Sequence, residues 1–132
     1  SKRERDHQMS TLKVGIANYD EMKTRTLAIA SGAFKPKRSD PKIWFTSMES
    51  FAKVLSDKNR VLLDLIMEKK PGSLAELADL SGRAKSNLSR TLHTMERYGL
   101  VQLKKDASGK VVPRVSYTDI VLDVSIGTRT SA

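Results

Sequence analysis

One face of the segment 85–98 concentrates side chains that can form hydrogen bonds with the edges of nucleotide bases. At 100° per residue, the direction opposite Leu88 carries hydroxyl and basic groups, namely Ser86, Ser89, Arg90, His93 and Arg97. Short hydroxyl side chains let a helix backbone approach a groove, and an arginine can donate two hydrogen bonds to one guanine. This pattern favours contact with duplex DNA, although an ordinary solvated helix face has a similar composition.

Two kinds of contact are expected from this segment and from the basic stretch that follows it. We predict base contacts by polar side chains of the helix, namely Ser86, Asn87, Ser89, Arg90 and His93. We predict phosphate contacts by the surrounding cations, namely Lys85, Arg97, Lys104, Lys105, Lys110 and Arg114. Arg90 is the strongest candidate, whereas a lone exposed histidine such as His93 is more often neither a ligand nor a catalyst.

The helices expected around this face follow one another closely. Ser73 and Glu76 have the spacing of a capping box, so a short helix is expected to begin there and to end at a turn containing Gly82. The next helix has an inward stripe formed by Ala84, Leu88, Leu92 and Met95. Alanine cannot cap a helix through its side chain, so the start of this second helix lacks a local stabilising contact.

A basic hairpin is predicted after the second helix. Strand character at 100–103 and 111–115 flanks a turn at 104–110 that contains three lysines. Two helices joined by a tight turn and followed by a hairpin have the order of parts in a winged helix-turn-helix. The sequence therefore predicts an α+β protein in which 85–98 is the recognition helix and 104–110 is the wing.

The charge is concentrated in the same part of the chain. The 132 residues carry a formal net charge of +9, and residues 83–114 contain eight basic and two acidic side chains. Such an excess favours a polyanionic partner, which is either a nucleic acid or an acidic protein surface. No apolar run reaches the roughly 18 residues of a spanning helix, so we expect a cytoplasmic protein that does not enter a membrane.

Catalysis and metal binding have little support in the sequence. The chain has no cysteine and only two histidines, His7 and His93, so no disulfide or zinc site is expected. No nucleophile and base occur in a recognisable set, and no glycine-rich phosphate loop is present. Asp119 and Asp123 fit a solvated strand edge or an intermolecular pair with arginine better than a pair of catalytic carboxylates. We therefore expect neither an enzyme nor a bound cofactor.

The first third of the chain reads as an extension of the DNA-binding part. After a polar arm at 1–8, alternating apolar residues predict a strand over 12–16, and a capping box of Asn18 and Glu21 predicts a helix over 19–30. Residues 31–42 contain Gly32, two prolines and several cations, so they read as a linker. Its basic side chains either reach DNA as a flexible arm or stay in solvent, namely Lys35, Lys37, Arg38 and Lys42.

The predicted DNA-binding domain extends over 43–126, after an N-terminal arm, strand, helix and linker at 1–42, and a frayed tail follows at 127–132. It begins with a short strand in which Trp44 and Phe45 are either partner anchors or core residues. A capping box of Thr46 and Glu49 predicts a helix with one apolar face, formed by Met48, Phe51, Ala52 and Leu55. A second helix, or a bend in the same one, follows with an apolar stripe of Leu62, Leu65 and Ile66, and alternating residues at 117–126 suggest an irregular last strand.

Two resemblances point the same way. The run from Ser86 to Leu92, followed by the run from Met95 to Val101, resembles the recognition helix and wing entry of MarR-like winged-helix regulators. The stretch from Ile43 through the hairpin to Arg114 is similar to small prokaryotic proteins described as DNA-binding, members of which occur as antitoxin partners of TumE-type toxins (TumA-like antitoxins). This second resemblance covers about residues 12–124.

The resemblances imply a homodimeric repressor of its own promoter that binds double-stranded DNA. MarR-like chains dimerise through long terminal helices, which residues 115–132 do not predict, so dimerisation is expected through the N-terminal strand and helix or through C-terminal strand pairing. An alternative is an antitoxin that neutralises a cognate toxin protein and uses DNA binding for autoregulation. RNA binding is less favoured, because no aromatic side chain punctuates the basic face as a stacking platform.

Overall fold

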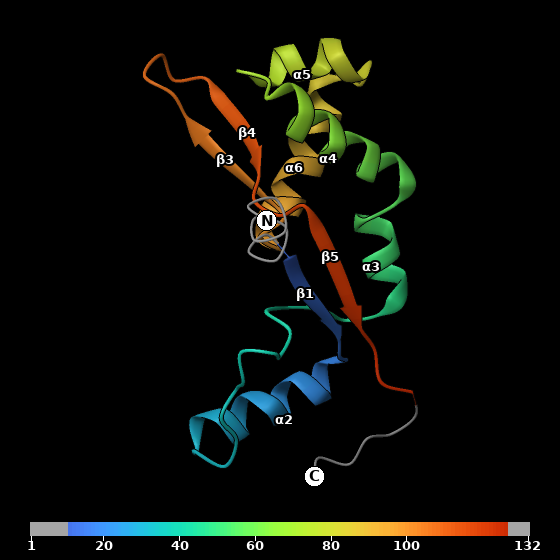
Figure 1. Ribbon diagram of the computed structural model, residues 1–132, viewed down its shortest axis with the longest axis vertical. Helices are drawn as coiled ribbons and strands as arrows, with labels where there is room; N and C mark the ends of the chain where they lie inside the picture. The colour runs from blue at the N-terminus through green and yellow to red at the C-terminus, as the bar shows by residue number, and fades with distance from the viewer. Residues whose placement is uncertain (1–10, 127–132) are drawn as a thin grey trace, which may run out of the picture. The chain divides into compact units, whose positions relative to one another are not determined.

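The computed structural model describes residues 11–126, which fold into the helices and strands of an α+β protein (Figure 1). Its contacts divide the chain into two compact units. The first contains residues up to Phe51 together with residues from Asp119 onward, and the second runs from Ala52 to Thr118. The predictions made for residues 1–8 and 127–132 lie outside the described residues.

A three-stranded parallel sheet forms the centre of the first unit. Its strands are β1 (Thr11–Ile16), β2 (Ile43–Phe45) and β5 (Asp119–Asp123), with β1 in the middle. In the register, Val14 is paired with Ile43 on one side and with Leu122 on the other. The domain predicted over 43–126 contains both β2 and β5. The structure joins both strands to β1, because parallel pairing connects segments that are distant along the chain.

The buried residues of this sheet follow the predicted alternation. Leu12 and Val14 of β1 are buried, and Phe45 of β2 is fully buried, which makes Phe45 a core residue. Phe45 packs edge-to-face against Phe51, with ring centroids 5.3 Å apart. A Cβ atom placed on Gly15 would lie 2.5 Å from the ring of Trp44, so the close approach of this ring requires glycine.

The helix α2 (Tyr19–Ala30) connects β1 and β2. The predicted capping box is confirmed: Asn18 Oδ1 accepts from the Glu21 amide at 2.8 Å, and Glu21 Oε1 accepts from the Asn18 amide at 2.8 Å. No residue of α2 is buried. Its large apolar side chains include Tyr19 and Leu27, which are 75% and 60% exposed.

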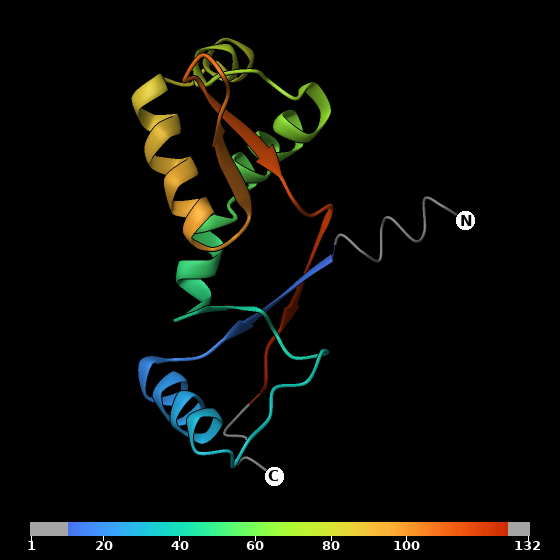
Figure 2. The same cartoon turned by 90° about the vertical axis from the view of Figure 1, so that its left-hand side faces the viewer.

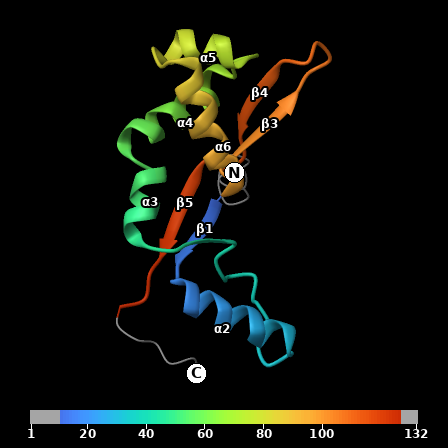
Figure 3. The same ribbon diagram turned by 180° about the vertical axis from the view of Figure 1, so that it is seen from behind.

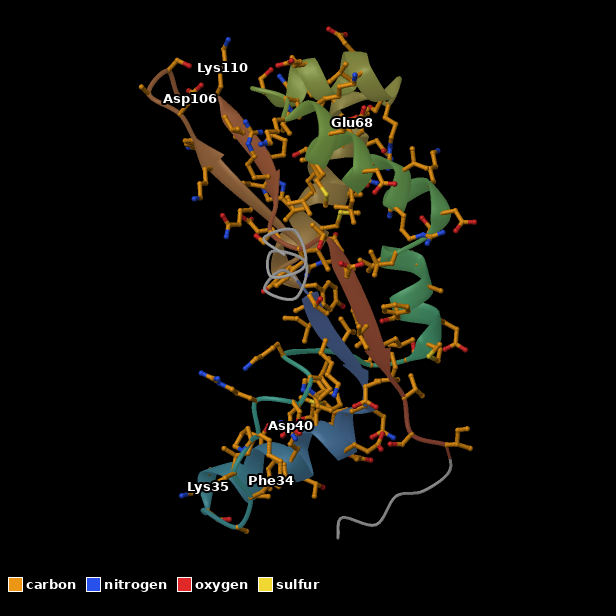
Figure 4. The ribbon with its side chains drawn as sticks, in the orientation of Figure 1. Phe34, Lys35, Asp40, Glu68, Asp106 and Lys110 are labelled. Atoms are coloured by element: carbon orange, nitrogen blue, oxygen red, sulfur yellow. The ribbon has the colours of Figure 1, made fainter. Side chains whose placement is uncertain are left out.

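The segment 31–42, predicted as a linker, is fastened to α2 and to the sheet. The guanidinium of Arg25 lies 4.9 Å from the ring centroid of Phe34 and 5.0 Å from that of Trp44, and it is 3.7 Å from Asp40. Figure 4 shows the labelled Phe34 and Asp40 beside α2. The linker prediction missed this anchoring because it depends on Arg25. The four basic side chains considered as a DNA arm are all exposed, namely Lys35, Lys37, Arg38 and Lys42.

Two helices follow β2 along the chain, and the second of them belongs to the second unit. Helix α3 (Met48–Val54) begins after Ser47, whose hydroxyl accepts from the Ser50 amide at 3.0 Å, so the predicted cap at Thr46 is wrong by one residue. Met48 and Ala52 are exposed, contrary to the predicted apolar face, while Phe51 and Leu55 are half-buried. Helix α4 (Asp57–Lys69) is separate, because Ser56 caps its first turn. Leu62, Leu63 and Ile66 are its buried residues.

Helices α5 (Leu74–Ser81) and α6 (Lys85–Arg97) complete the helical part of this unit, beside the hairpin (Figure 3). Gly82 ends α5 in a left-handed conformation with φ 72°, as its glycine predicts. Leu74 and Leu77 of α5 are buried, and Leu80 is 41% exposed. Leu88, Leu92 and Met95 of α6 are fully buried, whereas Ala84, predicted with them, is exposed because it precedes the helix.

The strands β3 (Val101–Lys105) and β4 (Val111–Val115) form an antiparallel hairpin next to α6 (Figure 2). Val101 and Pro113 are buried beneath it. Lys104 and Lys105 belong to β3, so the turn is shorter than the predicted 104–110. The register of β3 and β4 runs from the pair Val101 and Val115 to the pair Lys105 and Val111. The strand β3 therefore ends later than the predicted strand 100–103.

Candidate nucleic-acid interface

The start of α6 has no side-chain cap. Ala84 occupies the N-cap position with an extended backbone, at φ −63° and ψ 141°, and makes no capping hydrogen bond. The first turn of the helix contains no acidic residue but contains Lys85. The first backbone N–H groups of α6 therefore lack the acceptor that Ser56 and Ser73 supply to α4 and α5.

The polar face of α6 is exposed opposite the buried stripe. Four of the side chains assigned to it by periodicity are exposed, namely Ser86, Arg90, His93 and Arg97, and Ser89 is half-buried. Within the described residues, the guanidinium of Arg90 forms no hydrogen bond or ion pair, although its backbone carbonyl accepts from Thr94 Oγ1 at 3.1 Å. Arg97 makes only a long contact of 3.5 Å with Thr94 Oγ1. Both guanidinium groups therefore retain donors for another molecule.

His93 is held in one orientation by its own helix. Its Nδ1 lies 2.7 Å from the carbonyl oxygen of Ser89. A carbonyl oxygen can only accept, so Nδ1 carries the proton and donates. The neutral ring then presents Nε2 as an acceptor, and a protonated ring would present it as a donor.

Asn87 is hydrogen-bonded to Arg83, a residue for which the sequence predicted no specific contact. Arg83 Nε donates to Asn87 Oδ1 at 2.9 Å, and Nη2 donates to Thr91 Oγ1 at 3.3 Å. Arg83 Nη1 donates to Asn59 Oδ1 of α4 at 3.1 Å, and Asn59 Nδ2 donates to the carbonyl of Val54 at 3.0 Å. This network joins the start of α4 to the first turns of α6.

Only the local contacts of this network could be predicted from the sequence. Arg83, Asn87 and Thr91 are spaced by four residues, which places them on one helical face. The contact with Asn59 spans 24 residues, and no local pattern predicts it.

The lysines of the hairpin do not share one face. Side chains alternate along a strand, so Lys105 points to the same side of the sheet as Leu103 and the buried Val101, and Lys104 points to the other side. Lys110 follows the turn, and all three lysines are exposed. The helices pack on the side of Val101, and therefore Lys105 is the strand lysine directed toward them.

Asp106 organises the tip of the hairpin, where Figure 4 labels it with Lys110. Its Oδ1 accepts from the Ser108 hydroxyl at 2.7 Å and from the backbone amides of Ser108 and Lys110, both at 2.9 Å. Gly109 adopts φ 84° in the same turn. The hydrogen bond from the Ser108 hydroxyl, followed by that from the Lys110 amide, lowers the pKa of Asp106 below its ordinary value of 3.8.

The other acidic residue of the basic segment is also engaged. Glu96 Oε2 accepts from the Leu103 amide at 3.3 Å, on the edge of β3 that does not face β4. Glu96 and Asp106 are the only acidic residues of 83–114, and both carboxylates accept backbone hydrogen bonds. The acidic groups therefore stabilise the scaffold, while Arg90 and the lysines remain exposed.

Arg114 has a structural contact that the sequence did not predict. Its Nη1 donates to the carbonyl of Pro71 at 2.8 Å and to that of Pro113 at 2.7 Å, and the side chain is half-buried. This contact holds β4 against the turn between α4 and α5. Arg114 is therefore a weaker candidate for phosphate contact than the exposed lysines.

A shallow hollow of about 370 Å³ lies between the hairpin and the two helix starts. Lys85 and Lys110 contribute its charged lining. The remaining lining comes from the start of α5 and the end of the hairpin turn, namely Ser73, Leu74, Ala75, Gly109 and Val111. The hollow brings together two cations that are distant along the chain.

Among residues 11–126, no three His, Asp or Glu side chains are grouped closely enough to hold a metal ion. Asp123 pairs with Lys13 at 3.6 Å within the sheet, a contact that the sequence did not predict. Within the same range, no helix has both the length and the apolar composition needed to cross a bilayer.

Comparison with known proteins gives one match. No curated protein and no solved structure matches the chain. The family model named HVO_A0114 matches residues 54–122, which is more than half of the sequence and includes α4, α5, α6 and both strands of the hairpin. The chain therefore belongs to the HVO_A0114 family.

Proposed function

We propose that the second unit is a winged helix-turn-helix that binds duplex DNA in a sequence-specific manner. The observation that carries this proposal is the exposed polar face of α6, centred on Arg90, beside a hairpin that presents three lysines. The two carboxylates of 83–114, Glu96 and Asp106, both accept hydrogen bonds from the backbone. A helix of this kind fits the width of a major groove.

Each side chain has a proposed role. Base contacts are made by Ser86, Asn87, Ser89, Arg90 and His93, and phosphate contacts by Lys85, Arg97, Lys104, Lys105 and Lys110. The uncapped amides at the start of α6 add donors that a phosphate oxygen satisfies. Arg114 is assigned to the scaffold, because its guanidinium is bonded to Pro71.

The proposed regulator acts as a homodimer on its own promoter. Two copies of α6 would enter major grooves about one helical turn apart, and the site would be palindromic. This part of the proposal rests on the resemblance to MarR-like regulators. The basic charge and the polar helix face are compatible with it.

A titration at two salt concentrations tests the proposal. The full chain is titrated against the DNA upstream of its own gene and against a random duplex of equal length. We expect tighter binding to the upstream DNA by a factor of roughly 10³ or more, and a fall in both affinities as salt rises. Equal affinities for the two duplexes would contradict sequence-specific recognition. They would show only non-specific electrostatic binding to DNA.

A second candidate function is that of an antitoxin, favoured by the surface of α2. This helix buries none of its residues, and it exposes Tyr19 and Leu27. Exposed aromatic and apolar side chains are typical anchors for a protein partner. The adjacent gene product would be the toxin, and the two proteins should then copurify. A toxin that stays fully active in the presence of excess chain would remove this candidate.

A further inference from the structure

The hydrogen bond from Arg83 fixes the orientation of the side-chain amide of Asn87. A guanidinium has donors and no acceptor, so the atom of Asn87 that faces Arg83 Nε at 2.9 Å must be the oxygen. The amide nitrogen of Asn87 then lies on the other side of the planar group. Asn87 is exposed and occupies the third position of α6, in the part of such a helix that approaches bases most closely.

The partner that fixes this orientation is itself fixed. Arg83 is half-buried, and its other two nitrogen atoms donate to Asn59 and Thr91. Asn59 cannot turn its oxygen away without cost, because its Nδ2 also donates to the carbonyl of Val54. Rotation of the Asn87 amide would place its NH₂ group against a guanidinium, and two donors would then face each other.

We infer that Arg83 is a specificity-determining residue, which makes Asn87 select guanine and reject adenine. This inference rests on the proposed function. An asparagine recognises adenine by directing its oxygen and its nitrogen to the base together, so that it accepts from N6 and donates to N7. In this chain Arg83 occupies one acceptor site of the oxygen and places a positive charge beside it, which disfavours a further donor such as adenine N6, so Nδ2 is the group left for a base. A pure donor matches guanine, whose major-groove edge presents two acceptors, O6 and N7.

Arg83 and Arg90 have different roles in this inference. Arg90 offers its own guanidinium to DNA, whereas Arg83 acts through a second side chain and touches no base. Loss of Arg83 should therefore change which base is preferred at one position. A purely structural role would instead weaken binding to every sequence by the same factor.

Selection from a randomised duplex library tests this inference with the full chain. Wild type, Asn87→Ala, Arg83→Met and Thr91→Val are each used to enrich sequences. Asn87→Ala identifies the base pair that depends on Asn87, because preference at that pair disappears. We expect wild type to prefer guanine over adenine there by roughly tenfold. Arg83→Met frees the amide and should remove this preference at that pair alone.

Thr91→Val is the matched control. It deletes a different contact of the Arg83 guanidinium and leaves the bond between Arg83 and Asn87 in place. The preference for guanine should persist in this variant. Thermal melting of each variant shows whether it is folded, and a wild-type preference for adenine at the Asn87-dependent pair overturns the inference even if Arg83→Met is unstable.

The possible results are distinct. Adenine at the Asn87-dependent pair, or no pair that depends on Asn87, would overturn the inference while an enriched motif still supports the proposed function. A preference for guanine that survives Arg83→Met would also overturn it. The absence of any enriched motif with wild type would remove the proposed function and this inference with it.

Discussion

Two arginines show how differently the units of this protein use the same side chain. Arg25, in the first unit, lies about equally far from the rings of Phe34 and Trp44 and is paired with Asp40. Arg90, in the second unit, is exposed, and its guanidinium has no hydrogen-bond or ion-pair partner within the described residues. Arg25 stabilises the fold, whereas Arg90 is available to a ligand.

Because Arg25 and Arg90 differ in this way, net charge alone does not locate an interface. The chain has 24 lysine and arginine residues, and several of them are engaged within the protein. Arg83 and Arg114 belong to the basic stretch yet serve as clamps between elements. Exposed cations lie on α6 and the hairpin and also in the segment 31–42, and the proposed DNA contact uses those of α6 and the hairpin.

The largest expected effect comes from the core that supports the exposed face of α6. Leu88→Ala removes a fully buried side chain and should lower the free energy of unfolding by about 2–5 kcal/mol. Leu27→Ala, on the 60% exposed surface of α2, should change it by less than about 0.5 kcal/mol. Denaturant unfolding measures both, and equal losses would show that the burial described for α6 is wrong.

The stack around Arg25 depends on Gly15. Gly15→Ala places a methyl group 2.5 Å from the Trp44 ring and should destabilise the first unit by about 1–3 kcal/mol. Gly72→Ala is the control, because its Cβ would lie 3.4 Å from the end of the flexible Glu76 side chain. Adding Trp44→Leu to Gly15→Ala should relieve the clash, and a double variant no more stable than Gly15→Ala would contradict this explanation.

Exchanging the two arginines for alanine separates stability from binding. Arg90→Ala should cost about 1–3 kcal/mol of binding free energy on a specific site and relax its specificity, with no change in melting temperature. Arg25→Ala should leave DNA binding unchanged and lower the stability of the first unit by about 1 kcal/mol, through lost ring contacts. Loss of specific binding in a folded Arg25→Ala variant would contradict the purely structural role of Arg25.

The two strand lysines should differ in a smaller way. Lys105→Ala should weaken binding to all sequences alike and reduce the salt slope by about one unit, because one phosphate contact is lost. Lys104→Ala serves as its counterpart on the opposite face of the hairpin and should have a weaker effect. If Lys104→Ala gives the larger reduction, the other face of the hairpin meets the DNA.

The smallest effect is expected at the hairpin tip, where Asp106 is fully exposed. Its folded pKa lies below its ordinary value of 3.8, so its contribution to stability is complete above that value and is lost as the pH falls through the folded pKa. Carboxyl resonances followed during an acid titration should place the midpoint of Asp106 below 3.8. A Ser108→Ala variant should move the midpoint back toward this value, and an unchanged midpoint would exclude the hydroxyl as the main cause.

Local features of the fold were predictable from sequence. The capping contacts of Asn18 and Ser73 depend on residues three positions away, and the buried stripe of α6 depends on periodicity. At Ser73 the match is partial, because Glu76 accepts from the Gly72 amide at 2.7 Å instead of closing the box on Ser73. The exposed face of α6 followed directly from the same periodicity.

Features that depend on distant residues were not predictable. The pairing of β5 with β1 joins the two ends of the described chain, and the alternation within each strand does not specify its neighbours. The proline-rich segment 31–42 reads as a linker until Arg25 is placed against Phe34. Asn59, which anchors Arg83, has no sequence signal for this role because its partner lies in another helix.

Replacement of major-groove atoms tests most directly whether α6 reads bases. A duplex selected by the full chain is compared with the same duplex in which 7-deazaguanine replaces guanine, a change that removes the N7 acceptor and leaves pairing and phosphates in place. Wild type should lose roughly tenfold or more in affinity, while Arg90→Ala, which no longer uses that acceptor, should lose much less. Equal affinity of wild type for both duplexes would contradict recognition of the major groove by α6.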